Sequence, residues 1–230
     1  ELRLETELCL VYTATLLERA GAAEGLPREA LEPLLACGIH SVSAPVDATN
    51  LSNTELGQPT HAFDADTIQG AITIRRSRAG EMAWPLFTEA RIALPEGTLV
   101  IADEAKILAI AGVIGCEESK TTEATTRVLL ESACFNPVSV RKASRAIDIH
   151  TDSTARFERG SDPTYPLVGA GRVVHLLERC GWQRVGTTGV VGDWSDPGRI
   201  IHLSIPAAAS FLEHPLTAEE VALRLERYGF

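Results

Sequence analysis

Runs of apolar residues separated by Gly, Pro and charged residues predict that much of the chain forms short β-strands. Most of these runs are rich in β-branched or aliphatic residues, as strands are. The expected strands cover residues 8–17, 42–49, 71–75, 99–103, 107–115 and 128–135, two short strands or a hairpin within 91–100, strands around 185 and 190–191, and a last one at 201–205. The runs at 99–103 and 107–115 are apolar almost throughout, which indicates strands covered on both faces.

Apolar residues at helical spacing predict helices between these strands. The expected helices cover residues 27–36, 136–145, 155–159 and 163–180, a short one after 205, and one from 217. Asn136 and Asp162 each stand before a proline, an arrangement that often begins a helix. Residues 55–64 include Gly57, Pro59 and Asp64 and are expected to form a loop. The mixed order of strands and helices predicts an α+β (mixed α/β) fold.

The length and composition are those of a globular protein with one large domain, or with one domain and a further fragment. The chain has 230 residues, of which 45% are apolar and 23% are charged. It contains no apolar run of bilayer-spanning length, so no membrane partner is expected. The five cysteines are scattered and form no C-x-x-C pair, which favours reduced thiols in the cytoplasm over disulfides or a zinc site. The chain begins at Glu1, and we expect it to be a segment of a longer protein.

The net charge of −10 argues against a protein that binds a nucleic acid tightly by itself. Neutralising phosphates supplies most of the affinity of such proteins, and the basic residues of this chain form only small groups. These groups are Arg75–Arg78, Arg141 and Lys142 with Arg145, and Arg156 with Arg159. They suit a small RNA contact, and other modules would have to hold the body of the RNA.

The candidate functional residues lie in three segments of the chain. Residues 150–163 are rich in hydroxyls, and Thr151 and Ser153 can cap a helix whose free N–H groups face whatever lies in front of it. Residues 55–64 contain a single histidine, His61. Glu131 is the one acid of the apolar run 128–135, and its burial is costly unless it meets hydrogen-bond donors. From the residues alone, a structural carboxylate and two ordinary helix caps are the favoured explanation of these features.

Four segments resemble motifs of the beta subunit of bacterial phenylalanyl-tRNA synthetases. Residues 151–162 resemble T-[DE]-[AS]-S-x-R-[FY]-E-R-G-x-D, and residues 46–64 resemble V-D-x-T-N followed by E-x-G-Q-P-x-H-A-F-D. Residues 128–135 resemble [IV]-x-L-E-[SA]-A-x-F, and residues 111–119 resemble A-G-[IV]-[MI]-G-G-x-x-S. Cys116 departs from the last motif, because it stands where the family has its second glycine. The resemblance covers roughly residues 8–200.

In that family these motifs belong to an editing module with a layered β/β/α fold, which hydrolyses tyrosine wrongly attached to the phenylalanine tRNA. The resemblance implies an editing domain at residues 1–198 and the partial start of a winged-helix-like module at 199–230. It implies no cofactor for this fragment, since ATP and magnesium would belong to the whole synthetase. The implied partners are a tRNA 3′ end carrying tyrosine, the alpha subunit and the remaining beta modules, which form a heterotetramer in the family.

The resemblance also assigns roles to five residues. His61 and Thr151 are the catalytic candidates, and His61 could orient a water, bind the terminal ribose or act as a base. Glu131 would accept a hydrogen bond from the tyrosine phenol, Gly115 would let the backbone approach the substrate, and Ser153 would leave room for the ring. No metal site is implied. The expected reaction is ester hydrolysis by a positioned water, because the chain has no G-x-S-x-G nucleophile motif.

Two other functions are open. The first is a related module that binds an aromatic amino acid, or holds subunits together, without hydrolysis; Cys116 and the acidic charge favour it. The second is a generic cytosolic hydrolase, which has only scattered His, Glu and Thr residues in its favour. Phenylalanine activation is not expected, because nothing in the chain resembles the motifs of the alpha subunit.

Overall fold

The computed structural model describes residues 1–22, 24–195, 198 and 200–230. These residues divide into two compact units, Glu1–Trp194 and Ser195–Phe230, which are described separately. None of the described helices is long and apolar enough to span a membrane. The division at residue 198 and the winged-helix-like assignment of the tail stay predictions.

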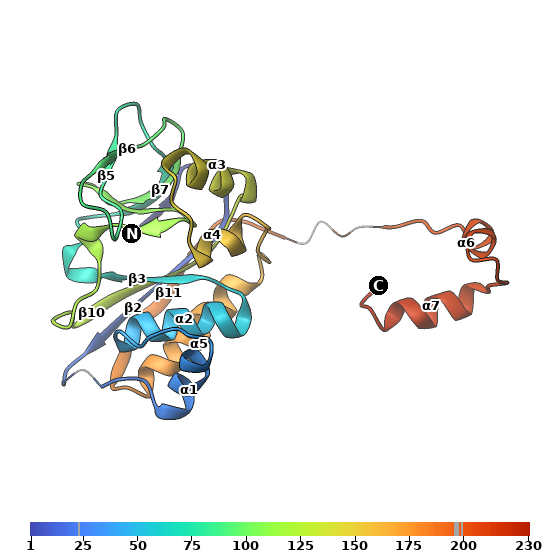
Figure 1. Ribbon diagram of the computed structural model, residues 1–230, viewed down its shortest axis with the longest axis horizontal. Coiled ribbons are helices and arrows are strands. Elements are labelled where there is room, and N and C mark those ends of the chain that lie inside the picture. The colour runs from blue at the N-terminus through green and yellow to red at the C-terminus, as the bar shows by residue number, and fades with distance from the viewer. Residues whose placement is uncertain (23, 196–197, 199) are drawn as a thin grey trace. The chain divides into compact units, whose positions relative to one another are not determined.

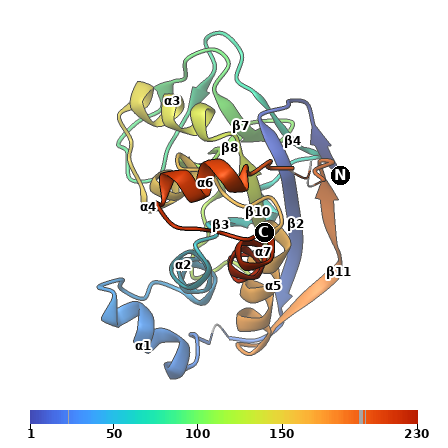
Figure 2. The ribbon, with the colours of Figure 1, turned by 90° about the vertical axis from the view of Figure 1, so that its right-hand side faces the viewer.

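The first unit is built on a four-stranded antiparallel sheet with the strand order β11-β2-β10-β3. Its strands are β2 (Cys9–Arg19), β3 (Thr60–Asp64), β10 (Arg127–Phe135) and β11 (Trp182–Val191). Figure 2 shows β2 and β11 running side by side. The strand β10 lies between β2 and β3, so residues from three distant parts of the chain come together on each face of the sheet.

Helices cover one face of this sheet (Figure 1). They are α1 (Arg28–Ala36), α2 (Ala44–Leu56) and α5 (Tyr165–Glu178). Leu17, Leu130 and Ala62 point to this side from β2, β10 and β3, and they share a buried cluster with apolar residues of all three helices. Burial of this apolar surface holds the helical layer on the sheet.

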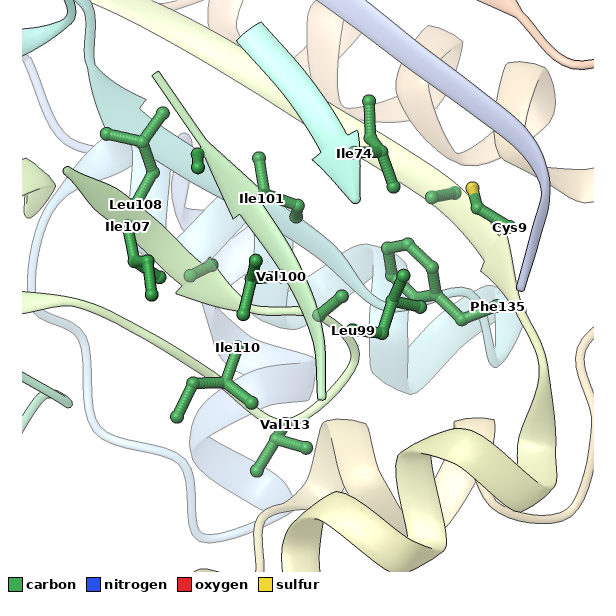
Figure 3. Close-up of a cluster of buried hydrophobic side chains, with 14 of the residues drawn as sticks. Cys9, Ile74, Leu99, Val100, Ile101, Ile107, Leu108, Ile110, Val113 and Phe135 are labelled. Atoms are coloured by element: carbon green, nitrogen blue, oxygen red, sulfur yellow. The ribbon is translucent and has the colours of Figure 1, made fainter. Parts of the chain in front are cut away.

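A second sheet of five strands, in the order β1-β4-β7-β8-β9, contributes to the core on the opposite face. Its strands are β1 (Leu2–Leu4), β4 (Ile72–Arg76), β7 (Leu99–Ala102), β8 (Ile107–Ile110) and β9 (Ile114–Gly115). Figure 3 shows the core, in which Phe135 of β10 belongs to the same cluster as Ile74 and Leu99 of this sheet. Every residue of β7 and β8 is buried, which confirms that these strands are covered on both faces. The layers are therefore sheet, sheet and helices.

The remaining elements are short. They are β5 (Met82–Ala83) paired with β6 (Ile92–Ala93), the 3-10 turns η1 (Ala65–Thr67) and η2 (Glu117–Ser119), and the helices α3 (Pro137–Ile147) and α4 (Asp152–Phe157). Helix α3 packs against α4 and against β7. As predicted, Asn136 caps α3, since its side chain accepts a hydrogen bond from the Ser139 N–H.

The strand predicted at residues 42–49 is wrong, because this segment begins helix α2. The β-branched residues there favoured a strand, but local hydrogen bonds favour a helix start. The carboxylate of Asp47 accepts from the Val42 N–H at 2.8 Å and from the Ser41 hydroxyl at 2.6 Å. Gly57, at φ 69°, ends the helix in the left-handed conformation that glycine adopts without strain.

The loop predicted at residues 55–64 is correct only for residues 57–59, which connect α2 to β3. Its first two residues belong to α2, and its second half forms β3, which pairs with β10 along the register from Thr60 to Asp64. His61 therefore lies on a strand and not in a loop. Residues 91–100 contain β6 and the start of β7, which confirms the alternative of two short strands. They form no hairpin, because β6 pairs with β5 while β7 pairs with β4 and β8.

Three predictions near the end of the chain need smaller corrections. Helix α5 begins two residues later than expected, because Asp162 accepts hydrogen bonds from the N–H and hydroxyl of Thr164. The two strands expected around 185 and 190–191 are one strand, β11, with an irregular register between Val185 and Gly189. Part of the expected linker at 193–198 lies outside the described residues.

The second unit contains helices and no described strand. They are α6 (Ile205–Phe211) and α7 (Ala218–Glu226), and the strand predicted at 201–205 is absent from the described part of this unit. Ile205 begins α6, where the Ser204 hydroxyl accepts from the Ala207 N–H. Thr217 and Glu220 form a capping box at the start of α7.

Candidate functional site

Glu131 and His61 are direct neighbours on the inner face of the four-stranded sheet. In the register of β10, Glu131 lies opposite Ala14 of β2 on one side and opposite His61 of β3 on the other. Directly opposed residues project from the same face, with Cβ atoms about 5 Å apart. Glu131 is only 6% exposed, and its carboxyl group makes no hydrogen bond or ion pair with any described residue.

Gly115 of β9 lies directly against the imidazole ring of His61. A Cβ atom built on Gly115 would stand 2.5 Å from both Cε1 and Nε2 of His61, closer than real contacts allow. The ring also packs edge-on against Phe63, with centroids 4.6 Å apart and planes at 73°. The Nε2 atom is buried and has no hydrogen-bond partner among the described residues. His61 is therefore held by packing and keeps one nitrogen available.

The start of helix α4 holds the segment that leads to Gly115. The Thr151 hydroxyl donates to the Val113 carbonyl at 2.8 Å and accepts from the Thr154 N–H at 3.1 Å. The Ser153 hydroxyl lies 3.4 Å from the Gly112 carbonyl, a weak donor contact. Thr151 thus caps the helix and fixes the 112–115 segment, and its single proton is already used.

The five predicted site residues therefore form two groups, which the 112–115 segment connects. Glu131, His61 and Gly115 are direct neighbours, and the structure brings Thr151 and Ser153 to them through the 112–115 segment. No hydrogen bond links either hydroxyl residue to His61 or Glu131 within the described part of the chain.

Cys116 lies next to this site but does not occupy it. Its backbone is extended, at φ −107° and ψ 150°, and side chains alternate between faces along extended chain. Cys116 therefore points to the side opposite the one where Gly115 meets His61. It is completely buried in the core, and this burial raises the pKa of its thiol to about 12.

Comparison with known protein families identifies the family to which the chain belongs. A model of the family described as "B3/4 domain" matches residues 8–181. The chain belongs to the B3/4 domain family. The chain is 37% identical over 226 residues to the phenylalanine–tRNA ligase beta subunit of Aliivibrio fischeri, across 97% of its own length and 28% of that protein. It is 39% identical over 179 residues to the same subunit of Acinetobacter baylyi, across 78% of this chain and 22% of that protein.

The chain thus spans about a quarter of the length of these relatives. The resemblance to phenylalanyl-tRNA synthetase beta subunits is confirmed. Its fold is also similar to a crystal structure of an N-terminal fragment of the phenylalanyl-tRNA synthetase beta subunit from Pyrococcus horikoshii. That similarity has a TM-score of 0.53 and 11% identity, and it covers 96% of this chain and 61% of the other. It confirms the predicted α+β fold.

Burial makes both titratable groups of the B3/4 site neutral at pH 7. Removal from water raises the pKa of Glu131 to about 8, because the carboxylate loses its hydration. The same effect lowers the pKa of His61 to about 4, because the imidazolium is disfavoured. A protonated acid therefore lies beside a neutral imidazole, and the pair suits a polar, uncharged group.

Gln58 is a positioning residue of the B3/4 site that the sequence analysis did not single out. Its side chain is 1% exposed, and its amide donates to the carbonyls of Pro59 and Ala133, each at 3.0 Å. These bonds tie the chain just before His61 to β10. The signal was present in the E-x-G-Q-P-x-H run, where a glutamine stands between a helix end and the site histidine.

Gly115→Ala is expected to move His61 while leaving the B3/4 fold intact. The added methyl group would collide with the tip of the imidazole, which can swing away. The ring would then gain contact with water, so the pKa of His61 should rise from about 4 toward 6.5. An NMR titration of the histidine ring protons measures this shift.

Gly171→Ala is the matched control, since a Cβ atom at this position in helix α5 meets nothing within 4 Å. It should leave the His61 titration unchanged. It should also stabilise the domain by about 0.5–1 kcal/mol, because alanine favours a helix over glycine. An unchanged His61 pKa in Gly115→Ala would contradict the contact between Gly115 and the ring.

Proposed function

We propose that this chain is the editing module of a phenylalanine–tRNA ligase beta subunit, which hydrolyses tyrosine misattached to phenylalanine tRNA. The observation that carries the proposal is the pair formed by Glu131 and His61. The Glu131 side chain and the Nε2 atom of His61 are buried, neither the carboxyl group nor this nitrogen makes a hydrogen bond with a described residue, and Gly115 lies against the histidine ring. Buried polar groups without partners are rare in native proteins, and a ligand would satisfy these two.

Glu131 supplies the selection between tyrosine and phenylalanine. The phenol O–H of tyrosine can donate to an oxygen of the buried carboxyl group, whereas phenylalanine would leave that group unpaired. Sites that hydrogen-bond a substrate hydroxyl reject the analogue without it by up to about 10⁵-fold. A synthetic site that excludes most tyrosine and a second site that requires the hydroxyl together make a double sieve.

His61 supplies a hydrogen bond at the ester. Its neutral imidazole has a free Nε2 that can orient the attacking water or bind the terminal ribose. A pKa of about 4 makes it a weak base, so positioning is the favoured role. Water adds to the ester carbonyl carbon, the bond to the ribose oxygen breaks, and the products are tyrosine and a free tRNA hydroxyl.

Thr151 and Ser153 act through the backbone in this proposal. The Thr151 proton is given to Val113, so Thr151 positions the 112–115 segment and does not donate to the substrate. Ser153, on the first turn of α4, keeps a small side chain against Gly112. The space that a larger residue would fill is then available to an aromatic ring. No metal or organic cofactor takes part in this step.

A small basic surface could guide the RNA end toward the site. Helices α3 and α4 carry four basic residues and a fifth follows α4; they are Arg141, Lys142, Arg145, Arg156 and Arg159. Among the described residues, only Arg159 of these five forms an ion pair, with Glu158. Since the chain carries a net charge of −10, the alpha subunit and the other beta modules must supply most of the tRNA affinity.

The proposal is tested with a whole synthetase that contains this chain and phenylalanine tRNA charged with tyrosine. His61→Ala is expected to slow release of tyrosine by about 10-fold, the value of one good hydrogen bond in the transition state. His175→Ala, at an exposed position of α5, is the control and should not change the rate. The proposal fails if the unsubstituted synthetase does not release tyrosine, and the role of His61 fails if both variants behave alike.

A module that binds tyrosine without hydrolysing it is the second candidate. It is favoured by the absence, among the described residues, of an acid bonded to His61 and of a free proton on Thr151. Titration of tyrosine methyl ester and phenylalanine methyl ester against the 230-residue chain separates the two. Preferential binding of the tyrosine ester without its breakdown in the whole synthetase would identify a binding module.

A further inference from the structure

Tyr12 of β2 is a buried phenol whose hydroxyl has no explanation in the fold. Its side chain is 0% exposed, and its Oη atom has no hydrogen-bond partner among the described residues. Burying a hydroxyl without a partner is unfavourable. Phe63 and Phe135 fill the same core with rings that carry no hydroxyl, so packing alone does not require a tyrosine here.

Tyr12 shares the inner face of the four-stranded sheet with Glu131. It lies opposite Ala133, which is two residues beyond Glu131 on β10. The two residues are therefore diagonal neighbours, a distance that an aromatic side chain can bridge. Their electrostatic coupling agrees with this geometry: burial raises the pKa of Tyr12 well above its usual value, and the Glu131 charge raises it further.

Small residues surround the two polar groups. Ala14 lies opposite Glu131, Ala133 lies opposite Tyr12, and Gly189 of β11 lies on the far side of Ala14. Gly115 faces the same region from β9 through its contact with His61. The two alanines leave more space beside the acid and the phenol than Leu129 and Phe63 do in the next row along the sheet, whereas Leu2 and His61 already pack against the two glycines.

We propose that Tyr12 is a second recognition residue for the substrate phenol, acting together with Glu131. A phenol is both a donor and an acceptor. Its O–H would donate to the Glu131 carboxyl group, and its oxygen would accept from the Tyr12 O–H. This inference rests on the proposed function of the same site, and it names the ligand class as an aromatic amino-acid ester with a hydroxyl on the ring.

The two contacts strengthen discrimination because phenylalanine can satisfy neither group. With a tyrosyl ester bound, both buried groups gain their missing partner. With a phenylalanyl ester bound, a carboxyl group and a hydroxyl both stay unpaired inside the protein. Each unpaired group opposes binding of the wrong substrate.

The test is Tyr12→Phe, which removes one oxygen atom and keeps the ring. In the whole synthetase, kcat/KM for release of tyrosine from phenylalanine tRNA should fall about 10-fold, with release of phenylalanine unchanged. In the 230-residue chain, affinity for tyrosine methyl ester should fall by a similar factor, and affinity for phenylalanine methyl ester should not change. The Tm should stay the same or rise, because the variant no longer buries an unpaired hydroxyl.

Tyr165→Phe is the matched control, because this tyrosine is 38% exposed at the start of α5. Combining Tyr12→Phe with Glu131→Gln should cost less than the sum of the two changes, since both act on one phenol. If the unsubstituted protein prefers the tyrosyl ester and Tyr12→Phe keeps the full preference, the inference is overturned while the proposed function stands. If the unsubstituted protein shows no preference in either assay, both are overturned.

Discussion

Glu131→Gln is expected to stabilise the domain relative to the unsubstituted chain by an amount that grows with pH. The pKa of Glu131 is about 8 in the folded state, against 4.5 for the exposed group. Between these values the folded state binds more protons than the unfolded state, so stability falls as the pH rises. Each pH unit corresponds to about 1.4 kcal/mol, and the gap between pH 4.5 and pH 7 is on the order of 3 kcal/mol.

His61 has the opposite dependence and partly hides that of Glu131. Its folded pKa is about 4, against 6.5 when exposed, so the unfolded state binds more protons between these values. This contribution to stability rises from pH 4 to pH 6.5 and is lost as the pH falls. From pH 4.5 to 6.5 the two slopes nearly cancel in the unsubstituted protein. Glu131→Gln should expose the rising slope of His61 in this range and remove the decline from 6.5 to 8.

Urea unfolding at pH values from 4 to 8 measures both effects. His61→Gln is the reciprocal control, because it should leave only the declining slope of Glu131. If the unsubstituted chain and Glu131→Gln give parallel stability curves across this range, the carboxyl group is not buried as described. A loss of stability at pH 7 in Glu131→Gln would also count against the unpaired geometry.

This stability cost bears on function. A buried acid without a partner weakens the fold at neutral pH, and the unpaired hydroxyl of Tyr12 adds to the cost. Both lie on the face shared with His61. Apolar residues at these positions would pack the core better. A ligand that completes their hydrogen bonds explains why polar groups are present in this part of the core.

The sequence predicted the strands and helices whose signals are local. The apolar runs of β2, β7, β8 and β10 and the cap at Asn136 needed no knowledge of distant residues. Helix α2 was mistaken for a strand because Val42, Val46 and Thr49 are β-branched. The helix start is favoured by the hydrogen bonds that Asp47 accepts from Val42 and Ser41. These bonds depend on geometry and not on composition.

Strand β3 was missed for a different reason. The five residues from Thr60 to Asp64 carry no strong strand pattern, and they are extended because β10 provides a partner far away in the chain. Without β3, His61 cannot be placed opposite Glu131. The identities of the site residues came from the resemblance, whereas their distances, the Thr151 bond to Val113 and the unpaired hydroxyl of Tyr12 required the structure.

Glu131→Ala is expected to abolish the preference for tyrosyl over phenylalanyl tRNA. The substitution removes the hydrogen-bonding group and leaves an apolar space in which either ring fits. The ratio of kcat/KM values for release of tyrosine and phenylalanine should fall at least about 100-fold. Most of the fall should come from tyrosine, which loses its bond, while phenylalanine no longer leaves a buried carboxyl group unpaired and gains.

Glu131→Gln separates hydrogen bonding from charge in the same assay. The amide keeps a carbonyl oxygen that can accept from the phenol, so this variant should retain part of the preference that alanine loses. Because burial raises the pKa of Glu131 to about 8, the acid is mostly neutral at pH 7 and glutamine imitates that form well. Equal and complete loss in both variants would show that an ionised carboxylate is needed. Full preference in both would place recognition of the phenol elsewhere in the synthetase.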